Sequence, residues 1–486
     1  MNKPNILIFM TDHQRGDTAP PYNKAITPNL DKFSKDAVAF SETYCPSPHC
    51  CPSRATFFTG LYPSQHGVWN NVDVGNTLSR GLYDNTRLWS DELKESGYDL
   101  YFTGKWHISS EEGPADRGWD VTYTTEKYYK DEGHRPPPHK RDWEIYLNNV
   151  ICKGNEERKE AQIIRPGYMI YEQYGLNETP FGDIKVIESA VESILNRPDN
   201  DIPWCHYVGT LGPHDPYFVP QRFLDMYDFD KIQLPKNYSD DMRDKPALYS
   251  RTRDRYKQLS ELEYRKSILH YLAFCSYEDY LFGKLLEALE KSGKTENTIV
   301  VYASDHGDYM GEHGLWAKGL PCFKGAYHVP LLIKWPDGIV NPGRVVNEFA
   351  NLADFAPTIL DIAGVKTKSE YIGMSLVPFL KGKKPEKWRD AVYTQTNGNE
   401  LYGIQRSVMT KEWKYVYNGF DYDELYNIRE DPDETTNLIG NPDCDAIVKD
   451  MCKRMWKFAY KVGDVCIHPY IMISHAPYGP GIIFND

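Results

Sequence analysis

The residues best suited to chemistry are concentrated in one segment, Cys45 to Gly60, which reads CPSPHCCPSRATFFTG. Pro52 suits the first position of a helix because it has no N–H to leave unpaired, and Gly60 is a favoured helix end. The sequence therefore predicts a helix from Pro52 to Thr59 with Cys50 just before its N-terminus. Free N–H groups and the positive end of the helix dipole favour an anion there. Together with Arg54, this segment combines a nucleophile, an anion-binding helix end and a guanidinium.

Four short apolar runs elsewhere in the chain each end in a polar cluster. The runs are 5–10, 97–103, 204–208 and 298–303, and the clusters after them are Asp12-His13, Lys105-Trp106-His107, His214-Asp215 and Asp305-His306. Compact apolar runs of this length are typical of buried strands. Ligands bind at the carboxyl ends of strands in open α/β sheets, so we expect the clusters to share one edge with the helix after Cys50.

The same edge carries candidate metal ligands. Asp12 and Asp305 supply hard carboxylate oxygens suited to Ca²⁺ or Mg²⁺, and His306 or His13 can complete or orient the ligand shell. Zinc is less favoured. A soft thiolate from Cys50 would match a hard cation poorly. Either Cys50 does not touch the metal, or it is not a thiol in the working protein.

Several of these motifs resemble one enzyme family. The run Cys50-Cys51-Pro52-Ser53-Arg54 matches the sulfatase pattern C-x-P-S-R. The segment from Gly97 to His107 is similar to the second signature of that family, and 304–307 with 311–318 resemble its metal-binding segment in an iduronate-sulfatase-like form. The chain is therefore identified as a member of the formylglycine-dependent sulfatases, within the alkaline phosphatase superfamily.

The resemblance implies an α/β fold. We expect a large domain, residues 1–384, with a mixed, mostly parallel sheet sandwiched by helices. A smaller C-terminal α+β domain with a short antiparallel sheet should follow over residues 385–486. The boundary is placed where a basic, proline-containing stretch at 381–385 gives way to short aromatic strands near 392–394 and 413–417.

Other elements follow from local patterns. Helices are expected over 28–38, 88–95, 259–289, 355–363 and 446–460, and a further strand over 329–335. Residues 120–185 show no clear period and are predicted to be a surface elaboration around a site. His468 and His475 lie in a tail that could fold back over that site.

By resemblance, Cys50 is oxidised to formylglycine, and one divalent cation is bound, with Ca²⁺ favoured over Mg²⁺ or Mn²⁺. One hydroxyl of the hydrated aldehyde would attack sulfur, and the second would expel sulfate. Asp12, Asp305, His306 and residue 50 match metal ligands. His13 stands where many sulfatases have a second aspartate and others a glutamine, which leaves the fourth protein ligand open.

The remaining roles are also implied by the resemblance. His107 matches the base, and His214 and Lys318 match positions that protonate or bind the leaving oxygen. Lys105 and Arg54 would neutralise charge on residue 50 and on the sulfate. His66 and His313, which lie next to glycines, are expected to be structural.

Composition limits the partners and the setting. The 56 basic and 69 acidic residues give a net charge of -13, which argues against nucleic acid as a ligand. The ten cysteines are scattered, as expected in a reducing compartment. The sequence suggests neither a signal peptide nor a membrane span, so we expect a cytoplasmic protein without membrane contact. Its partners would be a small sulfated substrate and a formylglycine maturation enzyme, and its oligomeric state is open.

The expected activity is hydrolysis of a small sulfate ester, on a sugar. A phosphonate monoester or phosphodiester hydrolase of the same superfamily is the alternative enzyme. A non-catalytic glycan-binding protein on a sulfatase scaffold is the alternative of another class. For Cys50 itself, the alternatives are a buried structural cysteine, or a metal or redox cluster with Cys45 and Cys51.

Overall fold

The computed structural model describes residues 3–74, 77–124, 126, 158–163, 169–171, 176–198, 200–399, 401–465 and 476–484. The predicted insertion at 120–185 lies partly outside these residues, and His468 and His475 lie wholly outside them.

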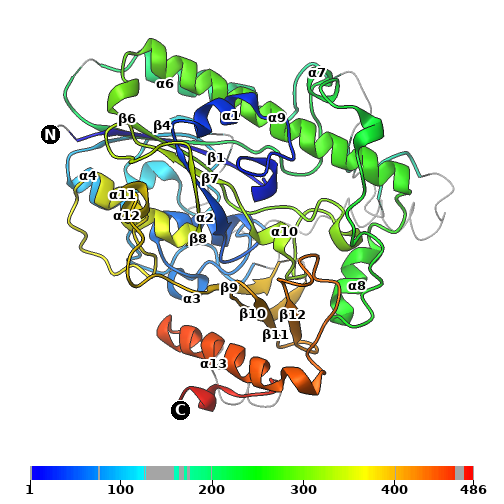
Figure 1. The fold of residues 1–486 in the computed structure, drawn as a ribbon. Helices are drawn as coiled ribbons and strands as arrows, with labels where there is room; N and C mark the ends of the chain where they lie inside the picture. The colour runs from blue at the N-terminus through cyan, green and yellow to red at the C-terminus, as the bar shows by residue number, and fades with distance from the viewer. Residues whose placement is uncertain are drawn as a thin grey trace.

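An eight-stranded sheet forms the centre of the large domain (Figure 1), with the order β4-β3-β5-β1-β6-β7-β2-β8. Its strands are β1 (Asn5–Thr11), β2 (Val38–Tyr44), β3 (Asp99–Gly104), β4 (Asp120–Tyr123), β5 (Trp204–Gly209), β6 (Thr298–Ser304), β7 (Leu331–Lys334) and β8 (Arg344–Asn351). Strand β7 is antiparallel to both of its neighbours, and the other pairs are parallel. The predicted mixed, mostly parallel sheet is confirmed.

The two faces of the sheet carry separate apolar cores. On β1, Leu7 and Phe9 belong to one buried cluster, whereas Ile6, Ile8 and Met10 belong to the other. Successive side chains of a strand point to opposite faces, so a strand covered on both sides reads as one continuous apolar run. This arrangement explains why the central strands could be recognised from the sequence.

Helices cover both faces of this sheet, as Figure 1 shows. One face is covered by α1 (Pro28–Ser34), α6 (Asp183–Leu195) and the long α9 (Glu261–Lys291), and the other by α2 (Cys50–Thr59), α4 (Trp89–Glu95), α11 (Phe355–Ile362) and α12 (Val377–Leu380). Shorter helices are α3 (Pro63–His66), α7 (Gln221–Leu224), α8 (Ala247–Asp254) and α10 (Lys324–Tyr327). The expectation of a sheet sandwiched by helices is therefore also confirmed.

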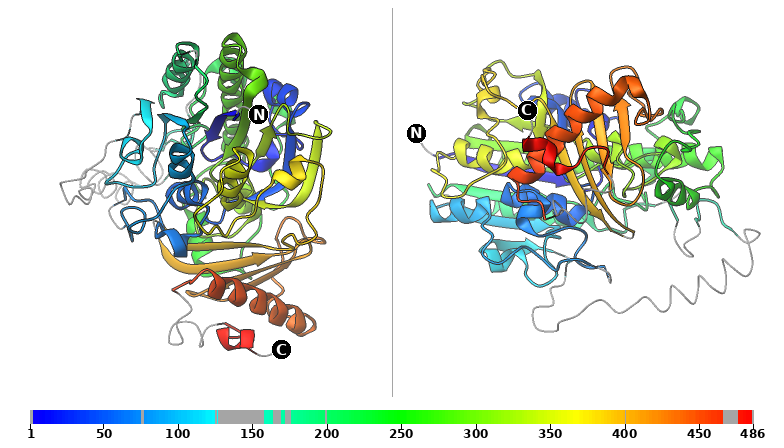
Figure 2. Two further views of the ribbon diagram at one scale, coloured as in Figure 1. Left: turned by 90° about the vertical axis from the view of Figure 1, so that its left-hand side faces the viewer. Right: turned by 90° about the horizontal axis from the view of Figure 1, so that it is seen from below.

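A second, antiparallel sheet follows in the order β12-β11-β10-β9. It comprises β9 (Val392–Gly398), β10 (Tyr402–Met409), β11 (Trp413–Asn418) and β12 (Glu424–Asn427), and α13 (Asp445–Lys461) packs on it (Figure 2). Val408, Tyr415 and Leu425 from the sheet share a buried cluster with Met451 and Trp456 of α13. The predicted short C-terminal antiparallel sheet is confirmed, and the boundary at residue 385 remains a prediction.

Three local predictions were wrong. The surface elaboration expected over 120–185 begins with β4, an edge strand of the central sheet, and ends in the first turn of α6. The helix expected over 28–38 ends at Ser34, and Val38 begins β2 instead. Val38 and Phe40 pack into the core on one face of the sheet and Ala39 into the core on the other, so the residues after the helix belong to a strand that is buried on both sides. The helix expected from Pro52 begins at Cys50, with His49 in extended conformation at the N-cap and Gly60 in the left-handed region as its end.

Within the described residues, no helix is both long and apolar enough to span a membrane.

Candidate active site

The carboxyl ends of β1, β3, β5 and β6 meet the N-terminus of α2. The structure brings together the ten residues predicted for catalysis or metal binding: Asp12, His13, Cys50, Arg54, Lys105, His107, His214, Asp305, His306 and Lys318. Strand β1 lies between β5 and β6, and this order places the polar residues that follow these strands side by side.

Cys50 is the first residue of α2 and is 1% exposed. Its Sγ lies 3.6 Å from Oδ1 of Asp12 and 3.2 Å from Nε2 of His306. Burial alone would raise the pKa of this side chain, but the ammonium groups of Lys105 and Lys318 bring it well below its usual range. Position 50 therefore favours a negatively charged atom.

Two carboxylates and an imidazole surround position 50. One donor atom each from Asp12, Cys50, Asp305 and His306 lies within 4.8 Å of the others, and all four side chains are buried. Carboxylate oxygens and an imidazole fit a hard divalent cation, whereas a sulfur atom at position 50 does not. The set would fit Ca²⁺ or Mg²⁺ well if residue 50 offered oxygen.

Buried cations balance the two carboxylates. Lys105 Nζ contacts Oδ2 of Asp12, and Arg54 donates from Nε to Oδ2 of Asp305 at 2.8 Å. Burial raises the pKa of Asp12, but its basic neighbours, Lys105 first among them, lower it to about 2. Arg54 also donates to the hydroxyl of Tyr207 at 2.9 Å, which fixes the guanidinium plane. Both cations therefore neutralise carboxylates of the candidate cation set.

Lys318 bridges two histidines. Its Nζ lies 2.5 Å from Nε2 of His13 and 2.9 Å from Nε2 of His214, and the two imidazole rings stack with centroids 4.1 Å apart. Burial and the neighbouring Lys318 charge lower the pKa of both histidines. The two rings are therefore neutral acceptors around one ammonium group, which carries the proton of this trio.

His13 does not join the four-residue set. Its Nδ1 lies 3.1 Å from Oδ2 of Asp308, its Nε2 faces Lys318, and only its backbone N–H reaches Asp305, at 3.2 Å. Its φ of 69° lies in the left-handed region, which is strained for a side chain of this kind. His13 instead forms a group with Asp12 and His214, since one donor atom of each lies within 4.8 Å of the others.

His107 occupies a second strained position, with φ 53°. Its Nε2 lies 3.1 Å from Oδ1 of Asp73, and its backbone N–H donates to Oε2 of Glu126 at 3.0 Å. The side chain of Glu126 also accepts the N–H of Trp106 at 3.0 Å. Glu126 thus fixes the backbone of this turn after β3, and Asp73 contacts its imidazole, which is directed toward α2.

Sequence reasoning missed the residues that hold these side chains. Asp308 follows His306 by only two positions, a spacing that could have signalled it, and it accepts the Tyr217 hydroxyl at 2.6 Å. Asp73 and Glu126 lie in segments without any period or motif, so no pattern pointed to them. Their roles follow only from the folded arrangement.

The two histidines expected to be structural are buried and hydrogen-bonded. His66 Nε2 lies 3.1 Å from the hydroxyl of Thr56, and His313 Nδ1 lies 2.7 Å from Oδ2 of Asp240. Neither belongs to any of the residue groups that could hold a metal among the described residues.

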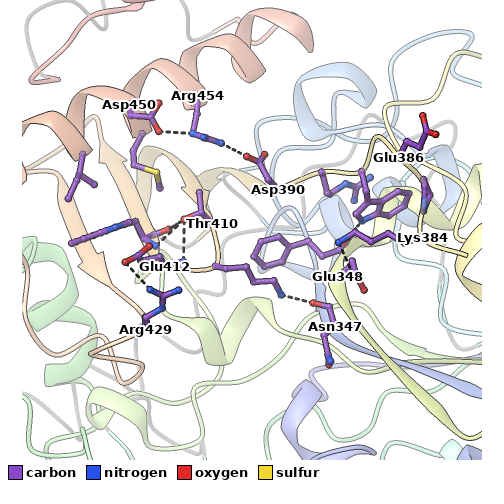
Figure 3. Close-up of a pocket in the computed structure, with 18 of the residues that line it drawn as sticks. Asn347, Glu348, Lys384, Glu386, Asp390, Thr410, Glu412, Arg429, Asp450 and Arg454 are labelled. Atoms are coloured by element: carbon purple, nitrogen blue, oxygen red, sulfur yellow. Dashed lines mark hydrogen bonds and ion pairs between the residues drawn. The ribbon is translucent and has the colours of Figure 1, made fainter.

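A cavity of about 720 Å³ lies elsewhere, between β8 and the C-terminal sheet (Figure 3). Several of its charged residues pair with one another: Arg454 with Asp390 and Asp450 at 2.7 Å each, and Arg429 with Glu412 at 3.3 Å. None of the candidate site residues lines it. This cavity is thus separate from the site described above.

Comparison with known families gives two matches. A family model described as "Sulfatase" matches residues 4–365, and one described as "N-sulphoglucosamine sulphohydrolase, C-terminal" matches residues 311–461.

The chain is also similar to individual proteins over most of their length. A choline-sulfatase of Rhizobium meliloti is 30% identical over 456 residues, covering 90% of this chain and 83% of that protein. An N-acetylglucosamine-6-O-sulfatase of Bacteroides thetaiotaomicron is 27% identical over 476 residues, with the same coverage. The crystal structure of a phosphonate monoester hydrolase of Agrobacterium radiobacter superposes with a TM-score of 0.76 at 23% identity, covering 95% of this chain and 96% of that one.

Proposed function

The chain belongs to the sulfatase family of sulfuric ester hydrolases, and we propose that it hydrolyses a small sulfate ester carried by a sugar. The observation that carries the proposal is the position of residue 50. It lies at a buried helix N-terminus between two carboxylates, an imidazole and the ammonium groups of two lysines. The sugar part draws on the similarity to an N-acetylglucosamine-6-O-sulfatase.

Residue 50 is proposed to work as formylglycine. The neighbouring donors are hard oxygens, which match an oxygen at position 50 better than sulfur. The hydrated aldehyde would supply the hydroxyl that attacks sulfur and the hydroxyl that then expels sulfate. A maturation enzyme must therefore oxidise Cys50, and it must act before folding is complete, because Cys50 is buried in the folded chain.

One divalent cation is proposed, held by Asp12, Asp305, His306 and residue 50, with Ca²⁺ favoured over Mg²⁺ or Mn²⁺. When bound, such a cation neutralises negative charge on the nucleophile and on the sulfate. His13 is proposed to stay outside this set, because its two ring nitrogens already contact Asp308 and Lys318.

The sulfate group would be gripped by groups fixed before it arrives. Lys105 and Lys318 flank position 50, which lies at the positive end of the α2 dipole. Arg54 stands one turn into the same helix and holds Asp305 in place. Because these charges are already oriented and desolvated, they stabilise charge that develops on sulfate oxygens without reorganising.

Lys318 and His214 are proposed to deliver a proton to the leaving oxygen. The ammonium of Lys318 donates to the neutral Nε2 of His214 at 2.9 Å, so a proton can reach either group. His107, oriented by Asp73, is proposed as the base that takes a proton from residue 50 when sulfate is expelled.

Turnover of 4-nitrophenyl sulfate, measured against aryl phosphonate monoesters and phosphodiesters, tests the reaction type. The similarity to a phosphonate monoester hydrolase makes that activity the second candidate. A clear preference for the phosphorus esters would replace the sulfatase assignment. Turnover that is unchanged in C50A would contradict the mechanism, and glycan binding without turnover would favour the non-catalytic alternative.

The mass of the peptide spanning residues 45–60 tests the modification. Conversion of Cys50 replaces its sulfur by oxygen and removes two hydrogens. An unmodified thiol in active protein from its native host would refute the formylglycine proposal. The peptide from C50S provides the unconverted control.

A further inference from the structure

A second cluster of metal-binding side chains lies beside the one already described. It comprises Cys51 in the first turn of α2, Asp73 in the loop after α3, and His107 after β3. One donor atom from each lies within 4.8 Å of the other two. None of the three belongs to the set proposed for the hard cation.

The donors of this cluster differ in kind from those of the first set. A sulfur, an imidazole nitrogen and one carboxylate oxygen are the ligands that Zn²⁺ takes at about 2.0–2.3 Å in tetrahedral sites. Ligand atoms in such a tetrahedron are roughly 3–4 Å apart, and the His107 Nε2 to Asp73 Oδ1 distance is 3.1 Å. Small side-chain movements would therefore complete a three-ligand site with an open fourth position.

The surroundings already hold these ligands. The backbone N–H of Val72 donates to Sγ of Cys51 at 3.4 Å, and the N–H of Cys51 donates to Oδ1 of Asn71 at 3.2 Å. One backbone N–H is thus directed at the Cys51 sulfur, although burial raises the pKa of this thiol. The loop that carries Asp73 thus also orients Cys51.

Solvent can reach the cluster. The side chain of Asp73 is 64% exposed and that of His107 is 16% exposed, so a solvated ion can reach the cluster. Besides its contact with Asp73, the imidazole of His107 lies against the sulfur atoms of Cys50 and Cys51.

We propose that Cys51, Asp73 and His107 form a site for a borderline-soft divalent ion such as Zn²⁺, and that its occupation inhibits hydrolysis by immobilising His107. Cys51 then loses its thiol proton to solvent and no redox step occurs. The inhibitory part rests on the proposed function, because it needs His107 in turnover. Metal binding itself does not depend on that function.

Binding is tested with Co²⁺ as a spectroscopic probe on C50S. This background removes the only other sulfur from the three groups of described residues that could hold a metal, and excess Ca²⁺ occupies the hard set. We expect one equivalent of Co²⁺ with a near-ultraviolet sulfur-to-cobalt absorption. The band should vanish in C50S/C51S and persist in C50S/C45S, where another buried cysteine has been replaced.

The exposed ligand provides a second variant that does not threaten folding. D73N should weaken Co²⁺ binding to C50S by at least about tenfold. A sulfur-to-cobalt band that persists in C50S/C51S would overturn the proposed site. So would a Co²⁺ affinity of C50S that neither C51S nor D73N changes.

Inhibition is measured on converted enzyme with Ca²⁺ in excess. Zn²⁺ should inhibit the wild type, and C51S should need at least about tenfold more Zn²⁺ for the same inhibition. Equal inhibition of both would overturn the proposal. If Co²⁺ binds but Zn²⁺ does not inhibit, the metal site would be supported and the proposed inhibition through His107 would be overturned.

Discussion

Nε of Arg54 donates to Oδ2 of Asp305 at 2.8 Å, and neither side chain is exposed to solvent. The pair connects the helix that carries residue 50 to the strand end that carries a candidate cation ligand. Because water cannot replace either partner, the arrangement of the site and the stability of the fold depend on the same contact.

Removal of this guanidinium should destabilise the protein strongly. R54A leaves the buried Asp305 carboxylate without its partner, so we expect the free energy of unfolding to fall by about 3–5 kcal/mol. R54K keeps the positive charge without the planar guanidinium group, so its free energy of unfolding should fall by less than that of R54A. Urea unfolding without Ca²⁺ measures both, and a loss in R54A below about 1 kcal/mol would contradict the expectation.

Removal of the cation should abolish turnover and lower the melting temperature. Ca²⁺ at a hundred times its dissociation constant should add about 2.7 kcal/mol of stability. D12N removes a proposed ligand and should lose most of the stabilisation by Ca²⁺. D99N, at the exposed end of β3 that lies away from the site, should keep it. Calcium titration followed by thermal unfolding compares the three proteins. Equal calcium stabilisation of D12N and D99N would exclude Asp12 as a ligand.

Loss of the proton donors should depend on the leaving group. Nitrophenolate leaves as a stable anion, whereas a sugar alkoxide needs a proton as the bond breaks. We therefore expect H214A and K318A to lose about 10²–10⁴ in kcat on alkyl sulfates and much less on 4-nitrophenyl sulfate. K366A, at an exposed lysine, is the control. Equal losses on both substrates would argue against proton delivery by this pair.

The parts of this site that were predictable from the sequence have local signatures. Asp12 and Asp305 directly follow buried strands, and Cys50 precedes an N-terminal helical proline, so type, spacing and position could be read together. The order of strands in the sheet then brings them together, as the carboxyl-end rule for parallel strands predicts.

The unpredicted parts depend on long-range contacts. Asp73 and Glu126 contact the turn after β3 from loops with no apolar period, and only the folded chain gives them partners. Strand β2 was missed for a related reason: it directly follows a helical pattern, and only pairing with β7 and β8 separates the two.

Stability should fall as pH rises through the titration of Asp423. Burial raises the pKa of this carboxyl from 3.8 to about 7, although it accepts the Tyr415 hydroxyl and the Asn418 N–H. Between these values the folded protein keeps a proton that the unfolded chain has released, so unfolding becomes easier with pH, by on the order of 4 kcal/mol in total. D423N should make the fall of the unfolding free energy between pH 4 and pH 7 shallower, whereas D337N, at an exposed residue, should leave it unchanged. An unchanged slope in D423N would contradict this prediction.

Glu126 should act as a positioning residue for His107. Its carboxylate accepts the N–H groups of Trp106 and His107 at 3.0 Å each and holds the φ of 53° at His107. E126A frees this strained turn, so kcat should fall about 10²-fold with KM nearly unchanged. E126Q keeps an acceptor oxygen and should recover part of the loss. Hydrogen exchange at residues 105–107 should rise in E126A, and faster exchange with unchanged kcat would show that the turn need not be held for turnover.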